Sequence, residues 1–90
     1  MSSYYPHVRV LLAPEAQREF EDLPVVIQAR VVEVFDRLAH WPSVSGAKPL
    51  RHAWKGHFRI RVGDWRVIFQ VVSPDIIVVR ILHRSRVYEE

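Results

Sequence analysis

The second half of the chain has the apolar and polar pattern of three consecutive β-strands. Phe58–Val62 alternates strictly, and Trp65–Val72 and Ile76–His83 are strand-length segments rich in apolar residues. Gly63-Asp64 separates the first two segments, and a glycine at the first central position permits a type II′ turn. Ser73-Pro74-Asp75 is a typical turn before the last segment. We therefore predict a tight hairpin followed by a third strand, which is apolar on both faces and so central and buried.

The first half of the chain begins with a strand pattern and continues with helical patterns. His7–Leu12 opens with polar and apolar residues in alternation, which predicts a first strand. Pro14 lies where a helix can begin, because proline is tolerated in the first helical turn. The apolar residues Ala16, Phe20 and Leu23 fall on one face of that helix. A strand followed by an amphipathic helix is therefore expected before residue 24.

A second helix is predicted more clearly. Its end is expected at Trp41-Pro42, because the residue before a proline disfavours helical backbone angles. Ser43–Pro49 is then expected to be a polar loop, and Arg51–Trp54 a short strand. The apolar stripe that defines the helix has a period of about 3.6 residues and consists of Ile27, Val31, Val34, Phe35 and Leu38.

The order of these elements predicts one α+β domain spanning residues 1–90. Two N-terminal helices should pack on one face of a mostly antiparallel sheet of about four strands, in the order β-α-α-β-β-β. No apolar run approaches the roughly 18 residues of a membrane span, and the first residues lack the pattern of a signal peptide. We expect a soluble cytoplasmic protein with no membrane partner. The sequence has no cysteine, and its histidines and carboxylates do not have the spacing typical of a metal site. We therefore predict that the protein binds no metal and no cofactor.

The predicted hairpin separates apolar from basic side chains. Its turn places Arg61 opposite Arg66 and Val62 opposite Trp65, and side chains alternate between the faces of a sheet. One face therefore collects Phe58, Ile60, Val62, Trp65, Val67 and Phe69 against the helices, and the other collects Arg59, Arg61 and Arg66. Opposed arginines destabilise a strand pair. Either they form a clamp for a phosphate group, or they are a solvated basic face that discourages aggregation.

The distribution of charge also points to an anionic partner for the second half. The net charge is +3, but residues 1–45 carry four cations against six carboxylates, and residues 46–90 carry nine against four. Arginine outnumbers lysine 11 to 2. The planar guanidinium suits bidentate contacts with phosphates, although a genomic bias toward arginine gives the same count.

Titratable side chains gather where the last strand ends. His83, Arg84, Arg86 and Tyr88 follow one another within six residues. Histidine is the usual proton carrier near neutral pH, and a tyrosine can donate a proton or stack on a base. A single histidine or tyrosine at such a place is more often structural, but the cluster favours a functional role.

The sequence resembles the RelE/ParE superfamily of bacterial and archaeal toxins over nearly its whole length. The resemblance includes Ala13-Pro14-Glu15-Ala16, Leu23-Pro24 and the stretch from Lys48 to Phe58. It is most specific in the segment FRIRVGDWRVIF, residues 58–69, and in the ending HRSRVY, residues 83–88. Such a resemblance implies a toxin of a type II toxin–antitoxin system that cleaves mRNA, usually in the ribosomal A site. It also implies a cognate antitoxin that wraps the toxin and covers the basic surface.

The resemblance also implies roles for single residues. It implies a catalytic set of Arg59, Arg61, Arg66, His83, Arg84 and Tyr88, with Arg66 stabilising the phosphate and His83 at the position of a catalytic histidine. The remaining cations are read as contacts to the RNA backbone, namely Lys48, Arg51, Lys55 and Arg86. The expected reaction is metal-free attack by a ribose 2′-hydroxyl, which gives a 2′,3′-cyclic phosphate.

One departure from the family pattern leaves alternatives open. The best-known member has lysines at the positions of Arg59 and Arg61, and a lysine can act as a base where an arginine effectively cannot. The general base is therefore not identified from the resemblance. A ParE-like inhibitor of DNA gyrase remains an alternative, as does a degenerate toxin that acts with its antitoxin as a DNA-bound corepressor. A third is an RNA-binding domain without catalysis.

Overall fold

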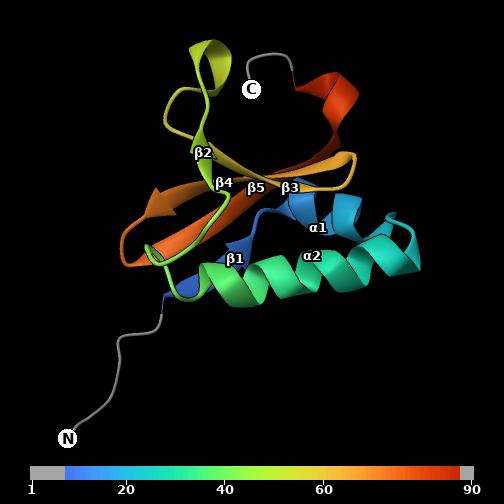
Figure 1. Ribbon diagram of the computed structural model, residues 1–90, viewed down its shortest axis with the longest axis horizontal. Helices are drawn as coiled ribbons and strands as arrows, with labels where there is room; N and C mark the ends of the chain where they lie inside the picture. Colours follow the sequence, from blue (N-terminus) through green and yellow to red (C-terminus); the bar gives the residue numbers. More distant parts are fainter. Residues whose placement is uncertain (1–7, 88–90) are drawn as a thin grey trace, which may run out of the picture.

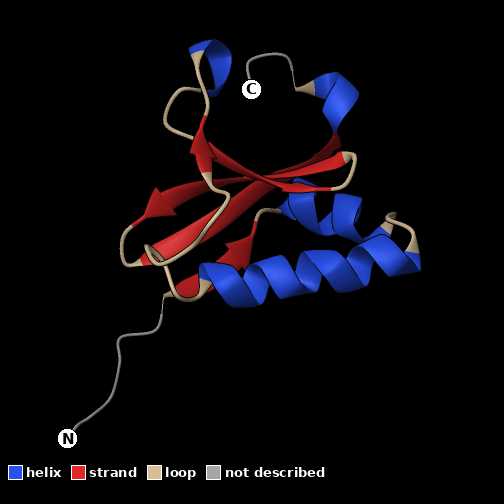
Figure 2. Ribbon diagram, viewed as in Figure 1, coloured by secondary structure: helices blue, strands red, loops and turns tan. Residues whose placement is uncertain are grey.

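The protein is an α+β domain in which two helices pack on a mostly antiparallel sheet, as predicted (Figures 1 and 2). The computed structural model describes residues 8–87. The strands form one five-stranded sheet in the order β1-β5-β4-β3-β2, and only the pair of β1 and β5 is parallel. None of the helices in the described part is long and apolar enough to cross a membrane. The elements are β1 (Arg9–Leu12), α1 (Pro14–Glu21), α2 (Val25–Leu38), β2 (Lys48–Pro49), η1 (His52–Trp54), β3 (Phe58–Val62), β4 (Trp65–Val72), β5 (Asp75–His83) and η2 (Arg84–Arg86).

Two local predictions between α2 and β3 are wrong. The expected loop Ser43–Pro49 ends in β2, so the described sheet has five strands rather than about four. A two-residue strand at an edge has no alternation from which it could be recognised. The expected strand Arg51–Trp54 is instead the 3₁₀ turn η1. His52 has a φ of 54°, which lies far from the extended region.

The hairpin of β3 and β4 has the predicted register. Arg61 pairs with Arg66, Val62 with Trp65, and the strands continue in step to the end of the pair. Gly63 has a φ of 58°, as the first central residue of a type II′ turn requires. Because the turn fixes the register, it also fixes which side chains of the hairpin face the helices.

The sheet is packed on both faces. The main core lies between the helices and the sheet, and Val67 and Phe69 of β4 are fully buried in it. We call the opposite side of the sheet the far face. A smaller cluster packs on it beneath η1 and η2, which both stand on the side away from α2 (Figure 2). This far-face cluster consists of Leu50, Ile68, Leu82 and Val87, with Trp54 and Val79 packed against it.

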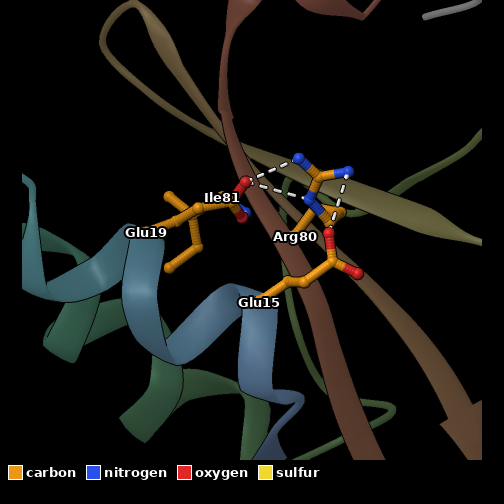
Figure 3. Close-up of polar contacts among 4 residues, drawn as sticks. All are labelled: Glu15, Glu19, Arg80 and Ile81. Carbon is orange, nitrogen blue, oxygen red and sulfur yellow. Dashed lines mark hydrogen bonds and ion pairs between the residues drawn. The ribbon is translucent and has the colours of Figure 1, made fainter.

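At the edge of β5, a carboxylate of α1 accepts hydrogen bonds where a neighbouring strand would otherwise pair (Figure 3). The pairing of β1 with β5 ends at Leu12 and Val78, so within residues 8–87 the next backbone groups of β5 have no strand beside them on that edge. Glu19 accepts a hydrogen bond of 2.8 Å from the backbone N–H of Ile81 and two more from Arg80, at 2.9 and 2.7 Å. These side-chain hydrogen bonds raise the pKa of the Arg80 guanidinium above its ordinary value. The first helix is thereby fixed to the strand that carries His83.

We expect Glu19→Ala to lower the free energy of unfolding by about 1–3 kcal/mol, because three donors lose a partner in a partly buried place. Urea denaturation of the purified protein measures this. Glu15→Ala is the matched control: its carboxylate lies 3.8 Å from Arg80 and its side chain is 64% exposed, so its removal should cost under about 0.5 kcal/mol. Equal losses for the two variants would contradict the role given to Glu19.

Candidate functional site

Arg61 and Arg66 face each other across the hairpin but differ in exposure. Arg61 is exposed, whereas Arg66 is only 6% exposed. The Nη1 atom of Arg66 donates to the carbonyl oxygens of Gly63 and Trp65, both at 3.0 Å. The guanidinium of Arg66 is thus held at the turn in one orientation, and Arg61 beside it is the more accessible cation.

Arg59 has a different environment from the other two arginines of the hairpin. It is 4% exposed, and its Nη1 atom donates to the carbonyl oxygen of Gly46 at 3.2 Å. In this position Arg59 supports the loop that precedes β2. The predicted face of three arginines is therefore present in register, but two of the three side chains are buried.

The far-face cluster positions the other predicted contacts. Leu50 and Trp54 pack in it at the two ends of the segment 50–54, which contains η1, and the backbone N–H of Leu50 donates to the carbonyl oxygen of His57 at 2.9 Å. Arg51, inside this segment, and Lys55, directly after it, are exposed. Packing of these two apolar residues therefore holds a pair of cations on the same side of the sheet as Arg61.

Arg84 is joined to the hairpin turn through Asp64. Its backbone N–H donates to the carbonyl oxygen of Asp64 at 2.7 Å, and its Nε atom lies 3.5 Å from the Asp64 carboxylate. The side chain is 63% exposed. The end of β5 and the turn between β3 and β4 are thus connected, and Arg84 lies at the same end of the sheet as Arg61 and Arg66.

His83 faces the opposite side of the sheet from these arginines. It pairs with Trp65, whereas its neighbour Leu82 pairs with Arg66. The rings of His83 and Trp65 meet edge to face, with centroids 5.5 Å apart. Both residues line a cavity of about 240 Å³ between α1 and the sheet, together with Arg86. The structure therefore brings His83 and Arg86 together but separates both from Arg61.

Two arginines of α2 lie beside Arg61, although the sequence pattern indicated only a scaffold helix. Arg30 and Arg37 line a hollow next to β3 that Arg61 also lines. The available signal was their spacing, because residues seven apart lie on one face of a helix. Tyr88, the remaining predicted site residue, lies outside the described residues.

Comparisons with known proteins identify relatives of the whole domain. The family model described as the ParE toxin of the type II toxin–antitoxin system parDE matches residues 10–88. Toxin RelG of Mycobacterium tuberculosis is 34% identical over 76 residues, which are 81% of this chain and 86% of that protein. Toxin RelE3 of Methanocaldococcus jannaschii is 28% identical over 85 residues, or 91% of this chain and 97% of that protein.

Two solved structures, one of a toxin–antitoxin complex and one of an isolated toxin, contain chains with a fold similar to that of this chain. The toxin–antitoxin complex RelBE2 of Mycobacterium tuberculosis contains a chain with a TM-score of 0.75 and 30% identity, and the match covers 87% of this chain and 99% of that one. The isolated RelE toxin of E. coli has a TM-score of 0.70 at 12% identity, over 84% of this chain and 83% of that one. The second match shows a common fold alone.

The contacts of His83 predict its tautomer. Its Nδ1 atom accepts a hydrogen bond of 3.2 Å from the backbone N–H of Ser85 and lies 2.9 Å from the Ser85 hydroxyl oxygen. An atom that accepts from an N–H carries no proton, so the neutral ring should be protonated at Nε2. Ring ¹⁵N chemical shifts at alkaline pH should show the Nε2–H form. A ring protonated mainly at Nδ1 would contradict this geometry.

Proposed function

The chain belongs to the RelE/ParE superfamily of toxins of type II toxin–antitoxin systems, and we propose that it is an endoribonuclease that cleaves mRNA at the ribosome. The observation that carries the proposal is the opposed pair of Arg61 and Arg66 at the hairpin turn. Like charges directly opposite each other on a strand pair repel, and a phosphate bound between two guanidiniums offsets that repulsion. The relatives named RelG and RelE3 support the RelE branch.

The reaction that suits such a site is transesterification within the RNA. A ribose 2′-oxygen forms a bond to the adjacent phosphorus and loses its proton, while the bond from phosphorus to the 5′-oxygen breaks. The 5′-oxygen takes up a proton, and the products are a 2′,3′-cyclic phosphate and a 5′-hydroxyl end. Negative charge accumulates on the phosphorane oxygens, so fixed cations at that point lower the barrier.

We assign charge stabilisation to Arg61 and Arg66. The carbonyl contacts of Arg66 support this role, because a guanidinium that is already oriented needs no reorganisation during the reaction. Arg84, joined to the same turn, orients the phosphate. Arg59 acts on the site indirectly by holding the loop at Gly46. Arg51, Lys55 and the nearby Lys48 contact the RNA backbone.

Proton transfer is assigned to Tyr88 in preference to His83. The ring of His83 lies on the face away from Arg61, and its Nδ1 atom already accepts a hydrogen bond. Tyr88 is the other proton-transfer residue that the resemblance to the RelE branch implies. Alignment of the RNA by the ribosome supplies much of the remaining rate.

We further propose that a cognate antitoxin covers the arginines of the far face. Chains related to this one are found in toxin–antitoxin complexes, among them RelBE2 of Mycobacterium tuberculosis. A basic surface that binds RNA phosphates also attracts carboxylates, so one partner can exclude the other. The toxin would then be active only when the antitoxin has been removed.

Arg61→Ala should reduce cleavage of mRNA on programmed ribosomes by about 10²–10³-fold, as the loss of a preorganised donor does elsewhere. The side chain is exposed, so the fold should survive, which circular dichroism can verify. Arg18→Ala, at an exposed position of α1, is the matched control and should cleave like the wild type. Wild-type rates for Arg61→Ala would show that the site is wrongly assigned.

The family model carries the name ParE, and this makes gyrase inhibition the second candidate. The same preparations should therefore be added to a DNA supercoiling assay. Inhibition of supercoiling without any RNA cleavage would replace the proposed function with that of the ParE branch. Absence of both activities from the antitoxin-free wild type would favour a degenerate toxin.

A further inference from the structure

A line of cations runs along the outer edge of β3, between that strand and α2. It borders two hollows, of about 310 Å³ and about 150 Å³, and Arg37 and Arg61 line both. We call the two hollows together the edge groove. β2 pairs with Phe58 and Arg59, and among the described residues no strand pairs with the remainder of this edge, which borders the groove. The charged residues that line it are Arg30, Glu33, Arg37, Lys48, Arg59 and Arg61.

The two arginines of α2 reach across to the sheet. A Cβ placed on Gly63 would lie 3.5 Å from Nη1 of Arg30, so this guanidinium reaches the hairpin turn. The Nη2 atom of Arg37 donates to the carbonyl oxygen of Ser45 at 2.9 Å, which fixes it beside the loop before β2. The two residues are two helical turns apart, about 10 Å along the axis. They therefore present two separate positive positions on one side of the groove.

The lining of the edge groove favours phosphate groups over a peptide. Five cations face a single carboxylate, Glu33, among its charged residues. Its apolar members, Val34, Ile60 and Val62, are at most 3% exposed because they belong to the main core. A bound peptide normally places apolar or aromatic anchors in pockets, and these residues offer little surface for them. A nucleic-acid backbone carries a regular series of negative charges, so it can bind to the cations without apolar anchors.

We propose that the edge groove binds the phosphate backbone of RNA next to the segment that is cleaved. Arg61 belongs both to the groove and to the hairpin pair, so one strand can pass from the far face around β3 and onto α2. Arg30 and Arg37 then contact phosphates that take no part in the reaction. The identity of the bound polymer as RNA rests on the proposed function, whereas the binding itself does not require cleavage.

The test measures binding of a 2′-O-methyl oligoribonucleotide, which lacks the attacking hydroxyl and so stays intact. Its affinity for the purified toxin is followed over a range of salt concentrations for the wild type, Arg30→Ala and Arg18→Ala. Loss of one phosphate contact should reduce the salt slope for Arg30→Ala by about 0.7 and weaken binding roughly fivefold at 0.1 M salt. Arg18→Ala should match the wild type. An unchanged slope and affinity for Arg30→Ala would overturn the proposal.

Two further measurements separate this inference from its alternatives. If Arg30→Glu weakens the binding of a poly-glutamate peptide but not that of the oligonucleotide, the groove serves an acidic protein and the proposal is overturned. Cleavage on ribosomes is measured with the same variants, and Arg30→Ala should keep the maximal rate and lose only affinity. A wild type that cleaves no RNA but shows the Arg30-dependent slope would refute the proposed function and leave the groove assignment standing.

Discussion

Burial of β5 on both faces is the constraint on which the rest of the structure depends. The strand pairs with β1 on one side and β4 on the other, and it contributes Ile81 to the main core and Leu82 to the far-face cluster. Beyond the end of β1, the Glu19 carboxylate accepts a hydrogen bond from the backbone of β5 at this edge. A strand held on both faces and both edges leaves its last residues little freedom. The position of Arg84 relative to the hairpin turn follows from this.

Alternation along buried strands divides the sequence-predicted site into two. Neighbouring residues of a strand point to opposite faces, so Leu82 lies with Arg66 and His83 lies with Trp65. The far face therefore combines the arginines with the two cations that flank η1, and the helix side combines the histidine with an aromatic ring. Proximity in sequence made His83 a partner of Arg84, but the pleat of β5 places His83 on the face of Trp65, whereas Arg84 lies beyond the strand and contacts Asp64. The chemistry proposed for this protein belongs to the far face.

The sequence predicted the parts of the fold that follow from local periodicity and turn chemistry. The hairpin, its register and the stripe of α2 all agree with the structure, because Gly63 and a repeated apolar pattern determine them. β2 and η1 could not be predicted, since neither has a period and both depend on packing from elsewhere. The burial of Arg59 and the approach of Arg30 to the hairpin depend on contacts between separate elements of the tertiary structure. The apolar pattern of a single strand or a single helix does not predict such contacts between elements.

Cleavage by His83→Asn tests most directly whether the far face alone performs the reaction. The asparagine oxygen can accept from the Ser85 N–H as Nδ1 does and suits the N-cap position before η2, so the turn is kept while the imidazole is removed. The single-turnover rate on programmed ribosomes should stay close to that of the wild type. A loss of about 10²–10⁴-fold, typical of a missing general acid or base, would contradict the account and return His83 to the catalytic set.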